Sequence, residues 1–280
     1  MQLAGYPLSP GIFYLTDRKM MKRSFFDVIE GLKRADLWLF LGWHDVKQRY
    51  RRSTLGPFWI TLASLLFVGA MTLVYSALFR QDIKSFLPLA ACGIVVWTLI
   101  AGCISEGCNL FITASTTIKQ VPAPLTVHSF RLIWTQLIYF LHNLLVVFIA
   151  LSATGIFFSL KTLLFFPAIA LLTLNLAWMA LFLGIMSARF RDMPLIIQSL
   201  ITGLFMATPV LWQISYLPPE RQWIAYINPF TYLIEIVRLP LLGIAPSYHI
   251  WLAVFVMAVI GWVLALITYG KARTRLAYWV

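Results

Sequence analysis

The sequence predicts an all-α membrane protein with six transmembrane helices, an N-terminal amphipathic helix at the membrane surface, and short re-entrant helices between the fifth and sixth spans. Of the 280 residues, 61% are hydrophobic and 11% are charged, and the mean hydropathy is +0.84. Soluble domains carry about 25% charged residues. Uncharged runs long enough to cross a bilayer also recur along the chain, and basic residues gather between them.

The first 56 residues are predicted to stay outside the bilayer core. Residues 1–26 read as a loosely ordered polar arm, and charges between 17 and 23 interrupt the apolar core that a signal peptide needs. Residues 27–56 combine a helix with a basic junction. The helix is amphipathic because apolar side chains recur at steps of three and four, at Val28, Leu32, Ala35, Leu39, Trp43 and Val46. We expect it to lie in the membrane surface, although packing on a soluble domain is an alternative.

Uncharged runs place the spans within residues 57–270. The first run holds 23 residues and starts at Pro57, which suits a first helical turn because its missing N–H needs no partner. The six predicted spans are about 57–79, 86–112, 132–158, 164–187, 193–213 and 250–270.

The outer region 214–248 differs because prolines interrupt it repeatedly. Its longest uncharged run, 222–234, is too short to cross a bilayer and reads as re-entrant or interfacial. Asn228 can cap a short helix in this region. Glu235 and Arg238 are three residues apart and can pair on one helical face. A helix dipping inward here is expected to narrow an exit.

The charge distribution sets the orientation. With the N-terminus inside and six spans, 17 of the 22 Lys and Arg residues fall on the cytoplasmic side and five on the outer side. This asymmetry is typical of inner-membrane proteins. We therefore expect a multi-pass protein of the bacterial inner membrane with both termini in the cytoplasm, including a tail at 271–280.

Several function classes are disfavoured. The basic residues lie between apolar runs rather than along one polar face, so anionic lipids are expected as partners and nucleic acid is not. The sequence has no G-x-x-x-x-G-K-[ST] phosphate loop and no His/Cys cluster of the metal-binding kind. We expect no catalytic residue, no metal and no cofactor in this chain. Cys92, Cys103 and Cys108 are expected to be buried thiols.

Two ionisable residues fall within apolar runs. Glu106 is the one carboxylate in such a run, and His142 lies about ten residues into the third predicted span. Such groups are costly to bury, so a role in transport is one interpretation. The alternative is a glutamate that reaches the interface or joins a small hydrogen-bonded network.

Aromatic residues make up 15% of the chain. Membrane-interface belts account for many of them. Aromatic rings lining a wide pore would also let a sugar chain slide past flat apolar faces. The candidates near span ends are Trp59, Tyr75, Phe79, Phe205 and Trp212.

The stretch before the first span is strongly basic, with Lys47, Arg49, Arg51 and Arg52. Basic residues flank the inner ends of most inner-membrane spans whatever the protein does. A surface that receives a cytoplasmic partner is the alternative interpretation.

Three stretches resemble a known family. They are VKQRYRRSTLGPFW at 46–59, ARFRDM at 188–193 and NPFTYLIEIVRLPLLG at 228–243. In this order, on six spans, they are similar to the permease subunit of type-2 ATP-binding-cassette exporters for O-antigen, capsule and teichoic-acid chains. The resemblance implies a non-enzymatic, channel-forming subunit that works as a homodimer with two ATPase subunits, which bind the ATP and Mg.

The resemblance also implies residue roles. Trp43, His44, Lys119 and Gln120 would contact the ATPase subunits. Arg189, Arg191 and Asp192 form a cytoplasmic turn, and the helices with Asn228, Glu235 and Arg238 shape the exit. The substrate would be a polysaccharide on undecaprenyl diphosphate, and Lys47, Arg49, Arg51 and Arg52 are candidates to meet its diphosphate.

Three alternatives stay open. A drug or small-lipid exporter of the same superfamily would share the architecture. A membrane transferase acting on lipid-linked sugars would need an acid/base pair at one depth, and Glu106 has no nearby carboxylate. A secondary carrier should show paired broken spans, whereas one broken region is visible, at 214–248.

Overall fold

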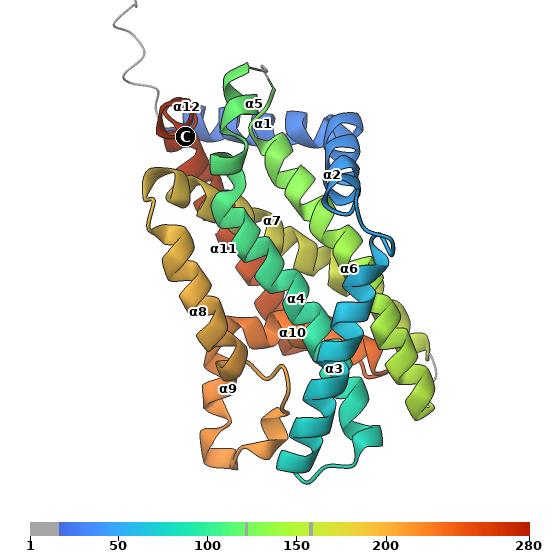
Figure 1. Ribbon diagram of the computed structural model, residues 1–280. Coiled ribbons are helices and arrows are strands. Elements are labelled where there is room, and N and C mark those ends of the chain that lie inside the picture. Colours follow the sequence, from blue (N-terminus) through green and yellow to red (C-terminus); the bar gives the residue numbers. More distant parts are fainter. Residues whose placement is uncertain (1–16, 121–122, 157–158) are drawn as a thin grey trace, which may run out of the picture.

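The computed structural model describes residues 17–120, 123–156 and 159–280, and within these ranges its regular structure is entirely helical. Five helical segments are long and apolar enough to cross a membrane. The chain is therefore a multi-pass membrane protein, and Figure 1 shows the long helices running along one axis. The segments are α3 (Phe58–Leu78), α4 (Ile83–Thr113), α6 (Thr126–Thr154), α7 (Phe165–Arg189) extended by the preceding 3-10 turn from Leu160, and α11 (Tyr248–Ala272).

The fifth predicted span is shorter than expected. It corresponds to α8 (Met193–Ala207), whose 15 residues extend about 22 Å, less than the roughly 30 Å of a bilayer core. The helix ends six residues before the predicted boundary at 213. Thr208 takes an extended conformation before Pro209, since a residue that precedes proline is disfavoured in the helical region.

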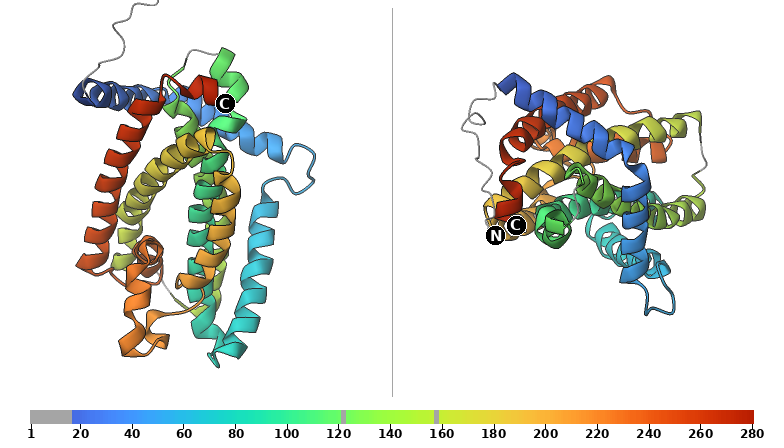
Figure 2. Two further views of the ribbon diagram at one scale, coloured as in Figure 1. Left: turned by 90° about the vertical axis from the view of Figure 1, so that its left-hand side faces the viewer. Right: turned by 90° about the horizontal axis from the view of Figure 1, so that it is seen from above.

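The N-terminal segment also differs from the prediction. Residues 1–16 of the expected arm lie outside the described residues, and α1 (Asp17–Lys33) begins ten residues before the predicted helix start at 27. The predicted single helix is then divided at Arg34, and α2 (Ala35–Arg49) follows. The division lets α1 cross the ends of α11 and α6 while α2 packs against α6. The view from above shows the change of direction between α1 and α2 (Figure 2).

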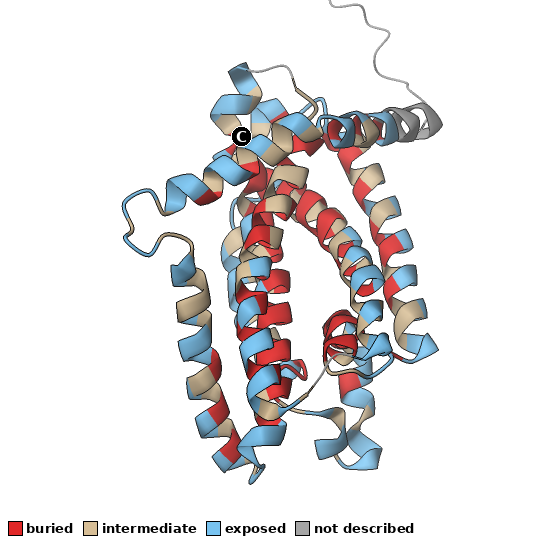
Figure 3. Ribbon diagram, turned by 90° about the vertical axis from the view of Figure 1, so that its right-hand side faces the viewer, coloured by how far each residue is buried: buried red, intermediate tan, exposed pale blue. Residues whose placement is uncertain are grey.

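Helix α4 forms the centre of the bundle. It packs against α3, α6, α7, α8 and α10, and most of its residues are buried, whereas α3 stands at the edge (Figure 3). Small residues permit this packing, as is common between helices in membranes. Gly107 of α4 lies against Ala180 and Gly184 of α7, where an added Cβ would come within 2.9 Å of the Ala180 Cα.

The short helices gather at the two ends of the bundle (Figure 1). We call the end that carries α1, α2, α5 (Ser115–Gln120) and α12 (Leu276–Trp279) the basic end. Part of the predicted loop 113–131 is thus helical. The opposite end carries the 3-10 turns η3 (Ile214–Tyr216) and η4 (Pro219–Arg221), together with α9 (Trp223–Ile227) and α10 (Pro229–Leu241), within the predicted outer region. Helix α10 is largely buried against α4, α7 and α11.

A substitution at Gly93 tests the close packing of α4. A Cβ at Gly93 would lie 2.1 Å from the Val210 carbonyl oxygen, whereas one at Gly69 of α3 would meet nothing within 4 Å. We expect Gly93→Ala to destabilise the fold by about 1–3 kcal/mol through overpacking, seen as a lower Tm in detergent. Gly69→Ala is the matched control, and helix propensity should leave it neutral or stabilise it by up to ~1 kcal/mol. Equal Tm values for the two variants would contradict the packing argument.

Candidate functional site

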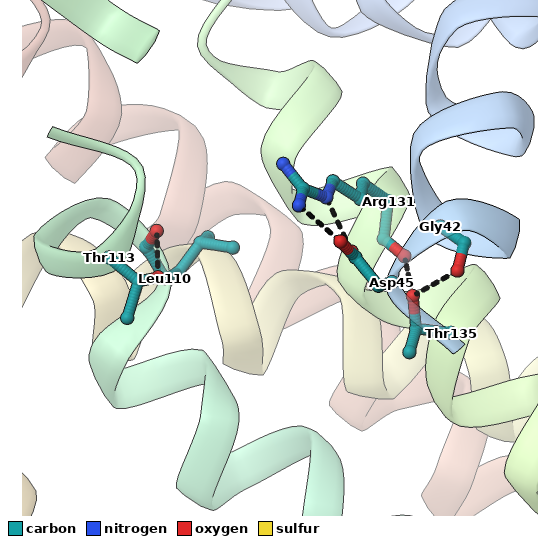
Figure 4. A network of polar contacts seen from close by, with 6 residues as sticks. All are labelled: Gly42, Asp45, Leu110, Thr113, Arg131 and Thr135. Carbon is teal, nitrogen blue, oxygen red and sulfur yellow. Dashed lines mark hydrogen bonds and ion pairs between the residues drawn. The ribbon is translucent and has the colours of Figure 1, made fainter. Parts of the chain in front are cut away.

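An ion pair fastens α2 to the bundle. Arg131 of α6 faces Asp45 of α2, and its Nε donates to Oδ2 at 2.6 Å while its second guanidinium nitrogen contacts Oδ1 (Figure 4). Beside this pair, the Thr135 hydroxyl lies 3.3 Å from the Gly42 carbonyl oxygen. Two parallel hydrogen bonds from one guanidinium fix orientation as well as distance. Helix α2 is therefore held in a defined register on α6.

A second carboxylate fastens α1. Asp27 is 4% exposed, accepts a hydrogen bond from the Tyr269 hydroxyl and lies 2.8 Å from an Arg273 nitrogen, both on or next to α11. Its backbone oxygen accepts from the Thr126 hydroxyl at 2.9 Å. Sequence reasoning missed Asp27 and Asp45 because a charged residue on an amphipathic helix normally faces water. Arg131 stands alone at the start of an apolar run, and this was the one feature of the sequence that indicated an acidic partner for it.

A polar cavity of about 500 Å³ opens between α2, α4 and α6 at the basic end. It is lined by charged and hydrogen-bonding side chains, among them Arg49, Glu106, His128, Arg131 and Gln136. A second cavity of about 620 Å³, which we call the α3 groove, lies between α3, α4 and α6. Arg49, Glu106, Gln136 and Tyr139 line both, so these four residues lie where the two cavities meet.

Of the four basic-junction candidates, only Arg49 lines these cavities. It donates from Nη1 to the Tyr139 hydroxyl at 3.1 Å, and its guanidinium carbon lies 5.5 Å from that ring's centroid. The Tyr139 hydrogen bond is the main cause that raises the pKa of Arg49. Glu106 is 3.9 Å away and half exposed, so it forms a loose, solvent-exposed ion pair with Arg49. Lys47, Arg51 and Arg52 are exposed.

The coupling candidates lie at the basic end. Trp43 is 57% exposed and His44 is exposed on α2, and Lys119 and Gln120 end α5. The Lys119 ammonium donates to the Val280 backbone oxygen at 2.6 Å.

The 189–192 turn meets the same short tail. Arg191 donates to the Trp279 oxygen at 2.6 Å, and the Arg189 guanidinium carbon lies 5.4 Å from the centroid of the Trp279 ring. Asp192 precedes α8 as its N-cap residue without a side-chain capping bond. The role of Trp279 had no signal in the sequence beyond an aromatic residue in a basic tail.

The aromatic side chains proposed to line a channel do not lie together around one opening within this chain. Trp59 lies in the first turn of α3 and lines the α3 groove, whereas Tyr75 and Phe79, with centroids 5.7 Å apart, end the same helix. The ring of Phe205 packs on Trp97 at 5.9 Å. Trp212 lies beyond the end of α8 and donates to the Met206 carbonyl oxygen at 3.3 Å.

At the opposite end the local predictions for α10 are confirmed. The Asn228 side chain accepts from the Phe230 amide at 3.0 Å and so caps the helix. Glu235 and Arg238 form an ion pair in which Arg238 is 2% exposed. Arg238 also donates to the Pro209 carbonyl oxygen at 2.6 Å, which ties α10 to the segment after α8. A cavity of about 720 Å³ adjoins this pair.

Comparisons with known proteins agree with this architecture. A model of the ABC-2 type transporter family matches residues 36–242, which is more than half of the chain and runs from α2 to the end of α10. The chain belongs to the ABC-2 type transporter family. The recognition made from the three sequence stretches is thereby confirmed at the level of the family.

Curated relatives carry more specific names. The chain is 23% identical over 243 residues to the O-antigen export system permease protein RfbA of Klebsiella pneumoniae, covering 86% of this chain and 94% of that protein. It is 28% identical over 193 residues to the O-antigen export system permease protein RfbA of Myxococcus xanthus, covering 68% of this chain and 74% of that protein.

Within the described residues, no group of three or more His, Cys, Asp or Glu side chains could hold a metal ion. Cys92, Cys103 and Cys108 are buried and free, as predicted. The family is one of transport subunits, and the polar groups described above join helices or line cavities.

The Asp45–Arg131 pair gives a direct test of how α2 is held. Both side chains are about 30% exposed, so we expect Asp45→Asn to weaken the attachment by about 1–2 kcal/mol. Amides of α2 should then exchange hydrogen for deuterium faster in the purified ABC-2 protein. Asp36→Asn, an exposed carboxylate in the first turn of the same helix, is the control and should leave exchange unchanged. Unaltered exchange in Asp45→Asn would show that other contacts hold the helix.

Proposed function

We propose that this chain is the channel-forming permease subunit of an ATP-driven exporter, and that it moves polysaccharide linked to undecaprenyl diphosphate from the cytoplasm across the bacterial inner membrane. The observation that carries the proposal is the likeness to O-antigen export permeases over 86% of the chain, on an ABC-2 domain. In this topology α8 serves as the fifth of six spans, and the basic end faces the cytoplasm because basic flanks favour that side.

The exporter contains two copies of this chain and two ATPase subunits that bind ATP and Mg. Two faces support a second copy. Helix α8 has no buried residue, and α3 leaves Leu66, Leu73 and Val74 more than half exposed. Large apolar faces are expected to be covered by lipid or by protein. A pore between two copies would place Trp59 near its inner mouth and Phe79 near its outer one, since they lie at opposite ends of α3.

The two ends of the bundle have different roles in this proposal. At the basic end, the exposed Trp43 and His44 of α2 and Lys119 and Gln120 of α5 receive the ATPase subunits. The basic junction meets the lipid diphosphate there. At the opposite end, α9 and α10 act as re-entrant helices at the exit, and the hydrogen bond from buried Arg238 to the Pro209 carbonyl oxygen ties α10 to the segment after α8.

Deleting the gene tests the proposed function. Surface polysaccharide should fall to background and undecaprenyl-linked polysaccharide should accumulate on the cytoplasmic side, because synthesis continues without export. A plasmid copy of this chain should restore export only together with an ATPase partner whose phosphate loop is intact. Unchanged surface polysaccharide, with altered resistance to a drug or altered transport of a small lipid, would instead indicate the other exporter class.

Trp43→Ala tests the coupling surface. An exposed tryptophan that becomes buried in an interface typically contributes at least about 2 kcal/mol, so affinity for the ATPase subunit should fall by roughly 30-fold. Pull-down or calorimetry on the purified subunits measures the change. Trp223→Ala is the matched control, because Trp223 is 58% exposed and lies at the opposite end of the bundle. Equal affinities for both variants would place the ATPase contact elsewhere.

A further inference from the structure

The α3 groove has mainly apolar walls. Ile60, Ala63 and Phe67 of α3 form one side of the groove, and Ile94 of α4 lies at the end farthest from Glu106. The Thr98 hydroxyl, also in the wall, is satisfied by the Ile94 carbonyl oxygen at 2.8 Å. From Ile94 to Glu106 the groove follows α4 for about 18 Å, given a rise of about 1.5 Å per residue. It therefore suits a hydrocarbon chain.

The polar cavity has the opposite character. Its lining includes His128, which is 6% exposed. Gln136 and Thr135 add neutral donors and acceptors in the same lining. Amide, hydroxyl and imidazole groups around 500 Å³ suit the hydroxyls of a sugar better than an apolar molecule.

Arg49 lies where the two cavities meet. One of its nitrogens donates to the Tyr139 hydroxyl, and its contact with Glu106 is an ion pair at 3.9 Å without a hydrogen bond. A guanidinium has five N–H donors, and the remaining donors of Arg49 have no hydrogen-bond partner within the described part of the chain. A phosphate can take two of them at once. Glu106 is then left to accept from a sugar hydroxyl.

We infer that the polar cavity and the α3 groove together form one carrier-lipid site in each copy of the chain. The part of the polyprenyl chain nearest the diphosphate lies in the α3 groove, the diphosphate rests on Arg49, and the first sugar occupies the polar cavity. This inference rests on the proposed function and narrows it, because it selects Arg49 alone among the four basic candidates. The apolar groove, the cation and the polar cavity then lie in the same order as the tail, the phosphate and the sugar of the carrier lipid.

Binding of undecaprenyl diphosphate to the purified full-length chain in nanodiscs tests the site, with native mass spectrometry as the readout. Arg49→Gln removes the charge, and we expect affinity to fall by about tenfold or more. Arg34→Gln is its control, since Arg34 is exposed, lies outside the basic junction candidates and lines neither cavity. The control should stay within about twofold of the parent chain.

Filling the groove provides an independent test. Ser64→Trp places a large side chain in the α3 groove, and Leu66→Trp places the same side chain on a 65% exposed position of the same helix. We expect Ser64→Trp to abolish retention of the lipid and Leu66→Trp to preserve it. If Ser64→Trp does not purify as a folded protein, Ala63→Trp, which also lines the groove and is exposed, replaces it.

Three outcomes would overturn the site. They are equal loss of affinity in Arg49→Gln and Arg34→Gln, retention of lipid in Ser64→Trp as well as in Leu66→Trp, or equal competition by phosphatidylglycerol, which would mark a groove for bulk lipid. The two proposals fail separately. Lost export on gene deletion combined with any of these results removes the site and keeps the exporter. Unchanged surface polysaccharide on deletion removes the exporter, whatever the lipid measurements show.

Discussion

Helix α4 is surrounded by five other helices, and burial from water cannot explain its position, because lipid tails are as apolar as its own side chains. Close packing has to hold it. Gly107 against Ala180 and Gly184 brings the backbones of α4 and α7 together, and Gly93 does the same against Val210. Because α4 is fixed from several sides, the face that it leaves open, with Thr98 and Glu106, has a fixed position as well.

The ion pairs around this packed helix are of two kinds, buried and partly exposed. The Glu235–Arg238 pair is buried within α10, where a charge that lost its partner would be strongly destabilising. Arg238 also donates to the Pro209 carbonyl oxygen, so this contact ties α10 to the segment after α8. The Asp45–Arg131 and Arg49–Glu106 pairs are partly exposed, so water can replace one partner at much lower cost. The ion pairs at the basic end therefore cost less to rearrange than the buried pair of α10.

The sequence predicted what depends on neighbours along the chain. Uncharged runs located all five long helices, and the Asn228 cap and the Glu235–Arg238 pair follow from spacings of two and three residues. Contacts between distant residues could not be predicted this way. Asp45 and Arg131 are 86 residues apart, and Arg49 and Tyr139 are 90 apart. Composition also gave no reason to divide the surface helix at Arg34, where the direction change depends on α6 and α11.

These contacts also bear on how force would reach a substrate in the proposed exporter. Trp43, Asp45 and Arg49 lie on one helix within two turns, so a push on the outer face of α2 moves the ion pair and the guanidinium together. Asp45 sets where α2 rests on α6, and Arg49 sets where the two cavities meet. A shift of α2 would therefore change the position of the cation that faces the carrier phosphate without any movement of α4. In the proposed exporter, α2 would therefore couple ATP hydrolysis to phosphate binding.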